Sequence, residues 1–157
     1  MTSRRKILSV LVPILIILTG CVTGGKKSGG KQAAGSTELK REYIDQAAIR
    51  LAQHYASRGA TIWEGRDKTV ALGEFTDRTG KNVDMQALRA SVVSALKSQK
   101  FPTPVAPGQK AETLLSGFVS AGGTAPTTTY KIEVSLKDVA TQEFLWVKND
   151  TIVLKGK

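Results

Sequence analysis

The sequence predicts an α/β fold, an α+β sandwich, in which a mostly antiparallel sheet of about four strands carries packed helices. Apolar residues recur every three or four positions in residues 38–57 and 85–100, which is typical of amphipathic helices. Four other segments have the alternation or the apolar content of strands: residues 68–75, 113–120, 128–137 and 144–148. The order helix, strand, helix, strands predicts one domain over residues 38–157.

The first helix is expected over residues 38–57. Its apolar stripe has these members: Ile44, Ala47, Ala48, Leu51 and Tyr55. Thr37 can cap the start of this helix, and Gly59 suits a left-handed residue that ends it. His54, the only histidine of the chain, lies beside the stripe. Without a Ser, Cys or acidic partner set nearby, it is expected to be a packed or exposed side chain rather than a catalyst.

Residues 68–75 are expected to form a strand, because apolar and small residues alternate from Val70 to Gly73. Phe75 breaks the alternation, which permits either a bulge or a strand that is buried on both faces. Residues 76–82 are polar and are expected to form a loop that leads into the second helix.

The second helix is expected over residues 85–100, with Asp84 as its N-cap. Val83 and Leu88 have the spacing of a hydrophobic staple around this cap. The apolar stripe has these members: Met85, Leu88, Val92 and Leu96. We expect Leu96 to be buried in the core.

The C-terminal third is expected to form strands. The prolines after the second helix leave room only for a short extended piece at residues 101–105, at a sheet edge. The strand over 128–137 alternates apolar and polar residues: Tyr130, Ile132, Val134 and Leu136 against Lys131, Glu133, Ser135 and Lys137. After a turn at residues 138–142, residues 144–148 complete a hairpin with one face in water and Trp146 buried.

The N-terminus has the pattern of a bacterial lipoprotein signal. A basic cluster at residues 4–6 precedes an apolar run, which ends in Leu18-Thr19-Gly20-Cys21. The run of residues 7–18 is too short for a transmembrane helix, which needs about 20 apolar residues. We therefore expect removal of residues 1–20 and a palmitate-bearing lipid anchor on Cys21. Residues 22–37 are rich in Gly, Ser and Lys and would form a flexible tether.

The formal net charge of +10 favours anionic partners. Nucleic acid is not expected among them, because the sequence has no zinc-ligand set, no aromatic-and-basic recognition strand and no recognisable reading helix. In the cell envelope, an anionic wall polymer or an acidic protein surface is the expected target. The alternative is that the lysines only keep a small domain soluble.

The sequence has no set of residues that is typical of an enzyme. It has no nucleophile elbow, no cluster of His and Cys ligands, and no pair of carboxylates in a context that would separate their pKa values. We therefore expect no catalytic residue, no metal site and no cofactor.

Several segments together resemble a known family. They are the strand and loop of residues 70–79, the capped helix that follows, Phe101, and the closing runs 131–136 and 143–146. These segments are similar to the LpoB family, outer-membrane lipoproteins that activate a bifunctional penicillin-binding protein. The resemblance covers roughly residues 40–150.

The resemblance implies a lipoprotein that catalyses no reaction itself. Its domain would bind a regulatory domain of a peptidoglycan synthase and stimulate glycan polymerisation and crosslinking. The candidate partner-binding residues are Asp77, Arg78, Thr79, Lys81 and Asn82. Arg78 and Lys81 would supply fixed positive charge. The alternative is that Asp77, Thr79 and Asn82 only cap and turn the chain.

The residue after Cys21 bears on location. Val22 stands where an Asp would commonly retain a lipoprotein at the inner membrane, so an outer-membrane anchor that faces the periplasm is expected. A second hypothesis is a structural or secretion-assembly lipoprotein of the curli type, whose domains have a similar strand, loop and helix. Such a protein would bind another envelope component instead of a synthase.

Overall fold

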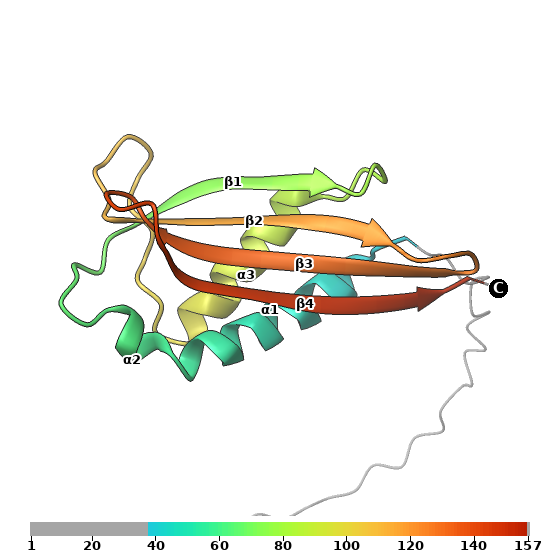
Figure 1. Ribbon diagram of the computed structural model, residues 1–157, viewed down its shortest axis with the longest axis horizontal. Helices are drawn as coiled ribbons and strands as arrows, with labels where there is room; N and C mark the ends of the chain where they lie inside the picture. Colours follow the sequence, from blue (N-terminus) through green and yellow to red (C-terminus); the bar gives the residue numbers. More distant parts are fainter. Residues whose placement is uncertain (1–37, 157) are drawn as a thin grey trace, which may run out of the picture. The chain divides into compact units, whose positions relative to one another are not determined.

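The centre of the fold is a four-stranded sheet with the strand order β1-β2-β3-β4 (Figure 1). The strands have these bounds: β1 Val70–Arg78, β2 Thr113–Gly122, β3 Thr127–Asp138 and β4 Phe144–Lys155. β1 pairs parallel with β2, and the other two pairings are antiparallel, which confirms the predicted sheet. The computed structural model describes residues 38–156, so the predicted signal, Cys21, the tether and the Thr37 cap lie outside the described residues.

The two long helices, α1 Arg41–Ala56 and α3 Met85–Ser98, cover the same face of the sheet, and the one-turn helix α2 Gly59–Ile62 follows α1 (Figure 1). The predicted stripe of α1 is confirmed, because each of its members is at most 2% exposed. In α3, Leu88, Val92 and Leu96 are buried, whereas Met85 is half-buried. No helix within residues 38–156 combines the length and the hydrophobicity that crossing a bilayer requires.

The core lies between the helix layer and the sheet. β3 contributes its whole apolar alternation to the core: Tyr130, Ile132, Val134 and Leu136. Leu96 and Trp146 are 1% and 6% exposed, which confirms that both are buried. Each large apolar side chain contributes about 1.5–3 kcal/mol when it leaves water. At one end of the core, Trp63 Nε1 donates a 2.6 Å hydrogen bond to Tyr55 Oη, and the Tyr55 ring packs edge-on against Phe101.

β1 is longer than the sequence predicts. The prediction of a loop from residue 76 onward is wrong for residues 76–78, because they pair with residues 118–120 of β2. Of the two alternatives left open at Phe75, the structure favours the bulge, since the register with β2 shifts between Leu72 and Phe75. After the shift, β1 remains paired with β2, so residues 76–78, which were predicted to lie in the loop, belong to the sheet.

β4 also extends beyond its predicted end at residue 148 and pairs with β3 as far as Lys155. The apolar alternation breaks where the charged Lys148 and Asp150 face the helix side of the sheet. Arg50 of α1 compensates the negative charge of Asp150, because its guanidinium donates hydrogen bonds of 2.6 and 3.1 Å to the Asp150 carboxylate. A carboxylate in a partly buried position is tolerated when it is paired in this way, so β4 can continue.

The predicted Asp84 cap of α3 is confirmed, since its Oδ1 accepts a 2.8 Å hydrogen bond from the Ala87 N–H. α3 ends at Ser98, before its predicted end, because Lys100 has a φ of 60° and so cannot continue a right-handed helix. Residues 101–105 form no regular strand, and the Val105 N–H donates one backbone hydrogen bond to the Val70 carbonyl of the edge strand β1. Prolines in this segment lack the N–H groups that a strand would use.

Gly59 does not end α1, which corrects the prediction. α1 is followed by Ser57 in a right-handed conformation, and Gly59 is the first residue of α2. A Cβ atom at position 59 would lie 3.3 Å from the Tyr55 ring. The glycine therefore permits close packing of α2 on the ring and is not needed for a left-handed turn.

Candidate functional site

The face of the sheet opposite the helices carries a mixture of apolar and basic side chains. We call the surface formed by the following residues the open face: Arg78, Phe118, Lys131, Lys137, Phe144, Val147 and Val153. No helix of the described residues covers this side of the sheet (Figure 1).

Strand alternation and register bring the open face together. β3 turns Ile132 and Val134 toward the helices, so the residues between and beside them point the other way. Directly opposed residues of paired strands share a face, and Lys137 is paired with Phe144 of β4. Phe144 and Val153, near the two ends of β4, are 63% and 55% exposed.

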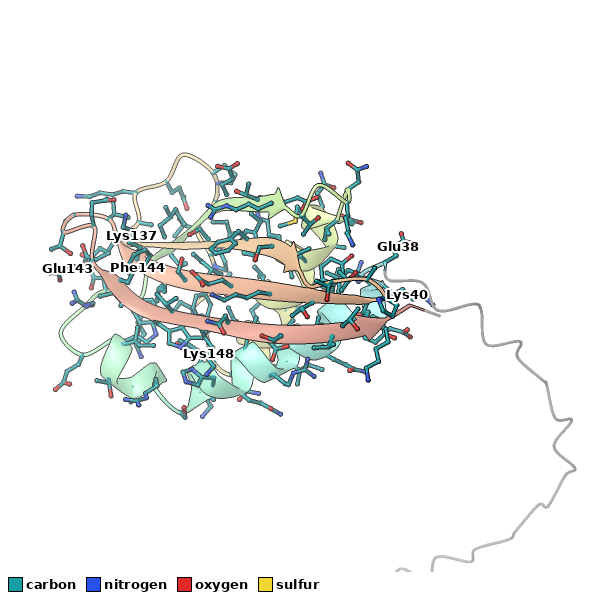
Figure 2. The ribbon with its side chains drawn as sticks, turned by 45° about the vertical axis from the view of Figure 1, so that its right-hand side comes forward. Glu38, Lys40, Lys137, Glu143, Phe144 and Lys148 are labelled. Carbon is teal, nitrogen blue, oxygen red and sulfur yellow. The ribbon has the colours of Figure 1, made fainter. Side chains whose placement is uncertain are left out.

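Two cations of the open face lie against aromatic rings. The guanidinium carbon of Arg78 is 4.1 Å from the centroid of the Phe118 ring. Lys137 lies near Phe144 (Figure 2), and its Nζ is 5.4 Å from the centroid of the Phe144 ring. Such contacts are worth about 0.5–1 kcal/mol at exposed sites and hold the cations close to the sheet.

The open face has an excess of positive charge. Lys131 is paired with Glu133 at 3.2 Å, whereas Arg78 and Lys137 have no carboxylate partner within residues 38–156. The arrangement can therefore present two fixed cations and neighbouring apolar side chains to the carboxylates of another molecule.

Asp77 and Thr79, both predicted as partner-binding residues, hold the turn after β1. The Asp77 carboxylate accepts hydrogen bonds from the Thr79 N–H, the Thr79 hydroxyl and the Val83 N–H, at 2.6–2.9 Å. Desolvation acts to raise the pKa of Asp77, but these hydrogen bonds together outweigh it, so the pKa lies below its ordinary value. Asn82 follows with a φ of 53°, a left-handed conformation that Asn tolerates.

The structure separates the two predicted cations of this segment. Arg78 lies on the open face, against Phe118. Lys81 Nζ lies 3.3 Å from Thr128 Oγ1 and 5.5 Å from the ring centroid of Tyr130, a residue that faces the helices. Arg78 and Lys81 therefore contact residues on opposite faces of the sheet.

The candidate partner-binding residues predicted from the sequence do not include the apolar members of the open face. Val147 and Val153 alternate with the buried Trp146 and Ile152 along β4, whereas Phe144 reaches the open face through the register shift that pairs it with Lys137. The alternation could have identified the two valines if the strand had been extended to its observed end, but no sequence pattern indicates the register shift that places Phe144.

No family model matches the chain, and no curated protein matches its sequence. Solved structures do match. The LpoB C-terminal domain from Salmonella enterica superimposes with a TM-score of 0.51 at 14% identity, over 69% of this chain and 97% of that domain. The domain has an LpoB-like fold. The LpoB C-terminal domain from Escherichia coli gives a TM-score of 0.47 at 13% identity, over 69% of this chain and 97% of that domain. The NMR structure of E. coli LpoB gives a TM-score of 0.48 at 12% identity, over 96% of this chain and 84% of that chain.

His54 lies on the helix side of the LpoB-like domain and contacts the hairpin. Trp146 Nε1 lies 3.1 Å from His54 Nδ1 and can only donate, so Nδ1 is the acceptor and the neutral ring carries its proton on Nε2. Desolvation, with the nearby charges of Lys148 and Arg58, lowers the pKa of His54 from 6.5. Among residues 38–156, no three His, Cys, Asp or Glu side chains are grouped closely enough to hold a metal ion.

The LpoB-like domain is expected to lose stability as the pH falls from about 7.5 to about 5, because protonation of His54 removes the acceptor of the Trp146 hydrogen bond. The folded-state pKa is the lower one, so this stability is fully present above 6.5 and is lost as the pH falls through the folded pKa. Thermal melting across this range measures the effect. His54→Gln keeps an acceptor that does not titrate, and should flatten the pH dependence; an equal dependence in both proteins would contradict the assignment.

Proposed function

We propose that this chain is a non-enzymatic, lipid-anchored protein of the outer membrane that binds and activates a peptidoglycan synthase in the periplasm. The observation that supports this proposal is the LpoB-like fold, which matches nearly all of the LpoB C-terminal domain. The lipoprotein signal that ends at Cys21 is consistent with an envelope anchor. The partner would be a bifunctional penicillin-binding protein, as the resemblance to the LpoB family implies.

The open face is the proposed docking surface. Arg78 and Lys137 are unpaired within the described residues and are held against aromatic rings, so they need little reordering when a partner binds. Exposed Phe144 adds apolar area beside Lys137. In this proposal Asp77, Thr79 and the left-handed Asn82 hold the turn that follows Arg78, and Lys81 lies outside the docking surface.

Charge reversal of the open face tests the proposal. Full-length chain with Arg78→Glu and Lys137→Glu should associate at least about tenfold more slowly with the periplasmic part of the synthase, because like charges then face an acidic surface. Surface plasmon resonance measures the association rate. The melting temperature should stay almost unchanged, since exposed charges contribute little to folding.

The matched control places the same charge change on α3. Arg89→Glu with Lys97→Glu alters exposed side chains on the helix side of the sheet. Its association rate should remain close to that of the unaltered chain. Equal slowing in both variants would mean that only total charge matters and would remove the open face from the proposal.

A structural or secretion-assembly role is the second candidate. β4 is an edge strand of twelve residues, and it has no strand partner on its outer side within the described part of the chain. A long free edge can pair with another copy of the same chain. Light scattering of the full chain in detergent separates the candidates, because a stable ring of many copies would favour assembly over synthase activation.

A further inference from the structure

A groove of ≈ 580 Å³ lies on the helix side of the domain, where α1, α2 and the start of β4 meet. Its wall includes His54 from the last turn of α1, Arg58 from the link between α1 and α2, and Glu64 and Arg66 from the segment after α2. Ile62, Leu145 and Trp146 supply an apolar part of the lining. The open face is on the other side of the sheet, so the groove is separate from the proposed docking surface.

The groove has an excess of positive charge. Arg58 is exposed and has no ion pair within residues 38–156. Arg66 uses one guanidinium nitrogen to bind Asp138 at 3.2 Å. Lys148 lies further along β4 (Figure 2) and is near enough to His54 to act on its charge, as Arg58 also is.

Neutral and acidic groups complement these cations. His54 carries its proton on Nε2, because Nδ1 accepts from Trp146, and the Thr61 hydroxyl also lines the groove. Glu64 is the one carboxylate among the lining residues and can accept hydrogen bonds from hydroxyl groups. The same carboxylate would repel a peptide with several acidic side chains, whereas a sugar that has one carboxylate and several hydroxyls matches the whole set.

We propose that this groove binds an acidic sugar through the sugar's carboxylate and hydroxyl groups. Arg58 would pair with the carboxylate, Glu64 and Thr61 would hydrogen-bond hydroxyls, and Leu145 would contact the sugar ring. The inference rests on the lining of the groove and does not depend on the proposed binding of a synthase.

The single histidine allows a direct test by NMR. In the full-length chain in detergent micelles, N-acetylmuramic acid should shift the His54 ring signals saturably, at about millimolar concentration. The bound carboxylate should also raise the apparent pKa of His54, since a nearby negative charge stabilises the imidazolium. N-acetylglucosamine, which has the same ring without the lactyl carboxylate, should do neither.

Two arginine variants make the test specific. Arg58→Gln should weaken the binding of N-acetylmuramic acid about tenfold, the effect of losing one hydrogen bond to a charged group. Arg89→Gln on α3 removes the same charge away from the groove and should leave binding unchanged. Four results would overturn the proposal: no saturable shift, equal shifts with both sugars, equal weakening by both variants, or binding of N-acetylglutamate as tight as that of N-acetylmuramic acid. The last result would assign the groove to an acidic peptide.

Discussion

Leu96→Ala is expected to lower the free energy of unfolding by about 2–5 kcal/mol. Leu96 is 1% exposed on the sheet-facing stripe of α3 and belongs to the same buried cluster as Leu88 and Val92. Alanine would remove the buried methyl groups and leave a cavity that the surrounding side chains fill only in part. Urea unfolding followed by circular dichroism measures the change, which should move the midpoint with little change in the slope.

The neighbouring residue of the same helix supplies the control. Lys97 is exposed, so Lys97→Ala should change the free energy of unfolding by less than about 0.5 kcal/mol. A cost below about 1 kcal/mol for Leu96→Ala would contradict the placement of this stripe against the sheet.

Gly117→Ala is expected to destabilise the domain by about 1–3 kcal/mol although it adds only one methyl group. A Cβ atom at position 117 would lie 2.8 Å from the Glu133 carbonyl oxygen and 3.0 Å from the Phe75 ring. The ring could rotate, but the carbonyl belongs to β3, which is paired with β2 on both sides of this position. The strand pairing must therefore be distorted, and thermal or urea unfolding would detect the loss.

Gly122→Ala is the matched control, because it lies in the same strand and a Cβ atom there would have nothing within 4 Å. This substitution should be neutral within about 0.5 kcal/mol. If both alanine variants were equally stable, β2 and β3 could not approach each other at Gly117 as closely as described.

The two proposed surfaces lie on opposite sides of the sheet. A partner on Arg78 and Lys137 would leave Arg58 and His54 uncovered, because the latter lie on the helix side. If both proposals hold, one domain could bind an acidic sugar and a synthase at the same time. The separate variants of Arg58 and of the open face distinguish the two activities.

The residues of the candidate site were only partly predictable. Lys131 and Lys137 follow from the alternation of β3, and Arg78 was selected with its segment. The aromatic ring that contacts Arg78 could not be predicted from the sequence. Phe118 is far from Arg78 along the chain, and the two residues meet only through the parallel pairing of β1 with β2. The separation of Lys81 from Arg78 likewise follows from the continuation of β1 to Arg78 and the turn after it.

Periodicity within single segments was enough to predict α1, α3, the buried alternation of β3 and the α+β class. An apolar stripe has to leave water whatever it packs against, so its pattern is local. The extent of β4 is different, because Asp150 interrupts the pattern and is compensated by Arg50, 100 positions earlier. The free energy that holds such residues in place comes from contacts between distant segments, which exist only after the helices have packed on the sheet.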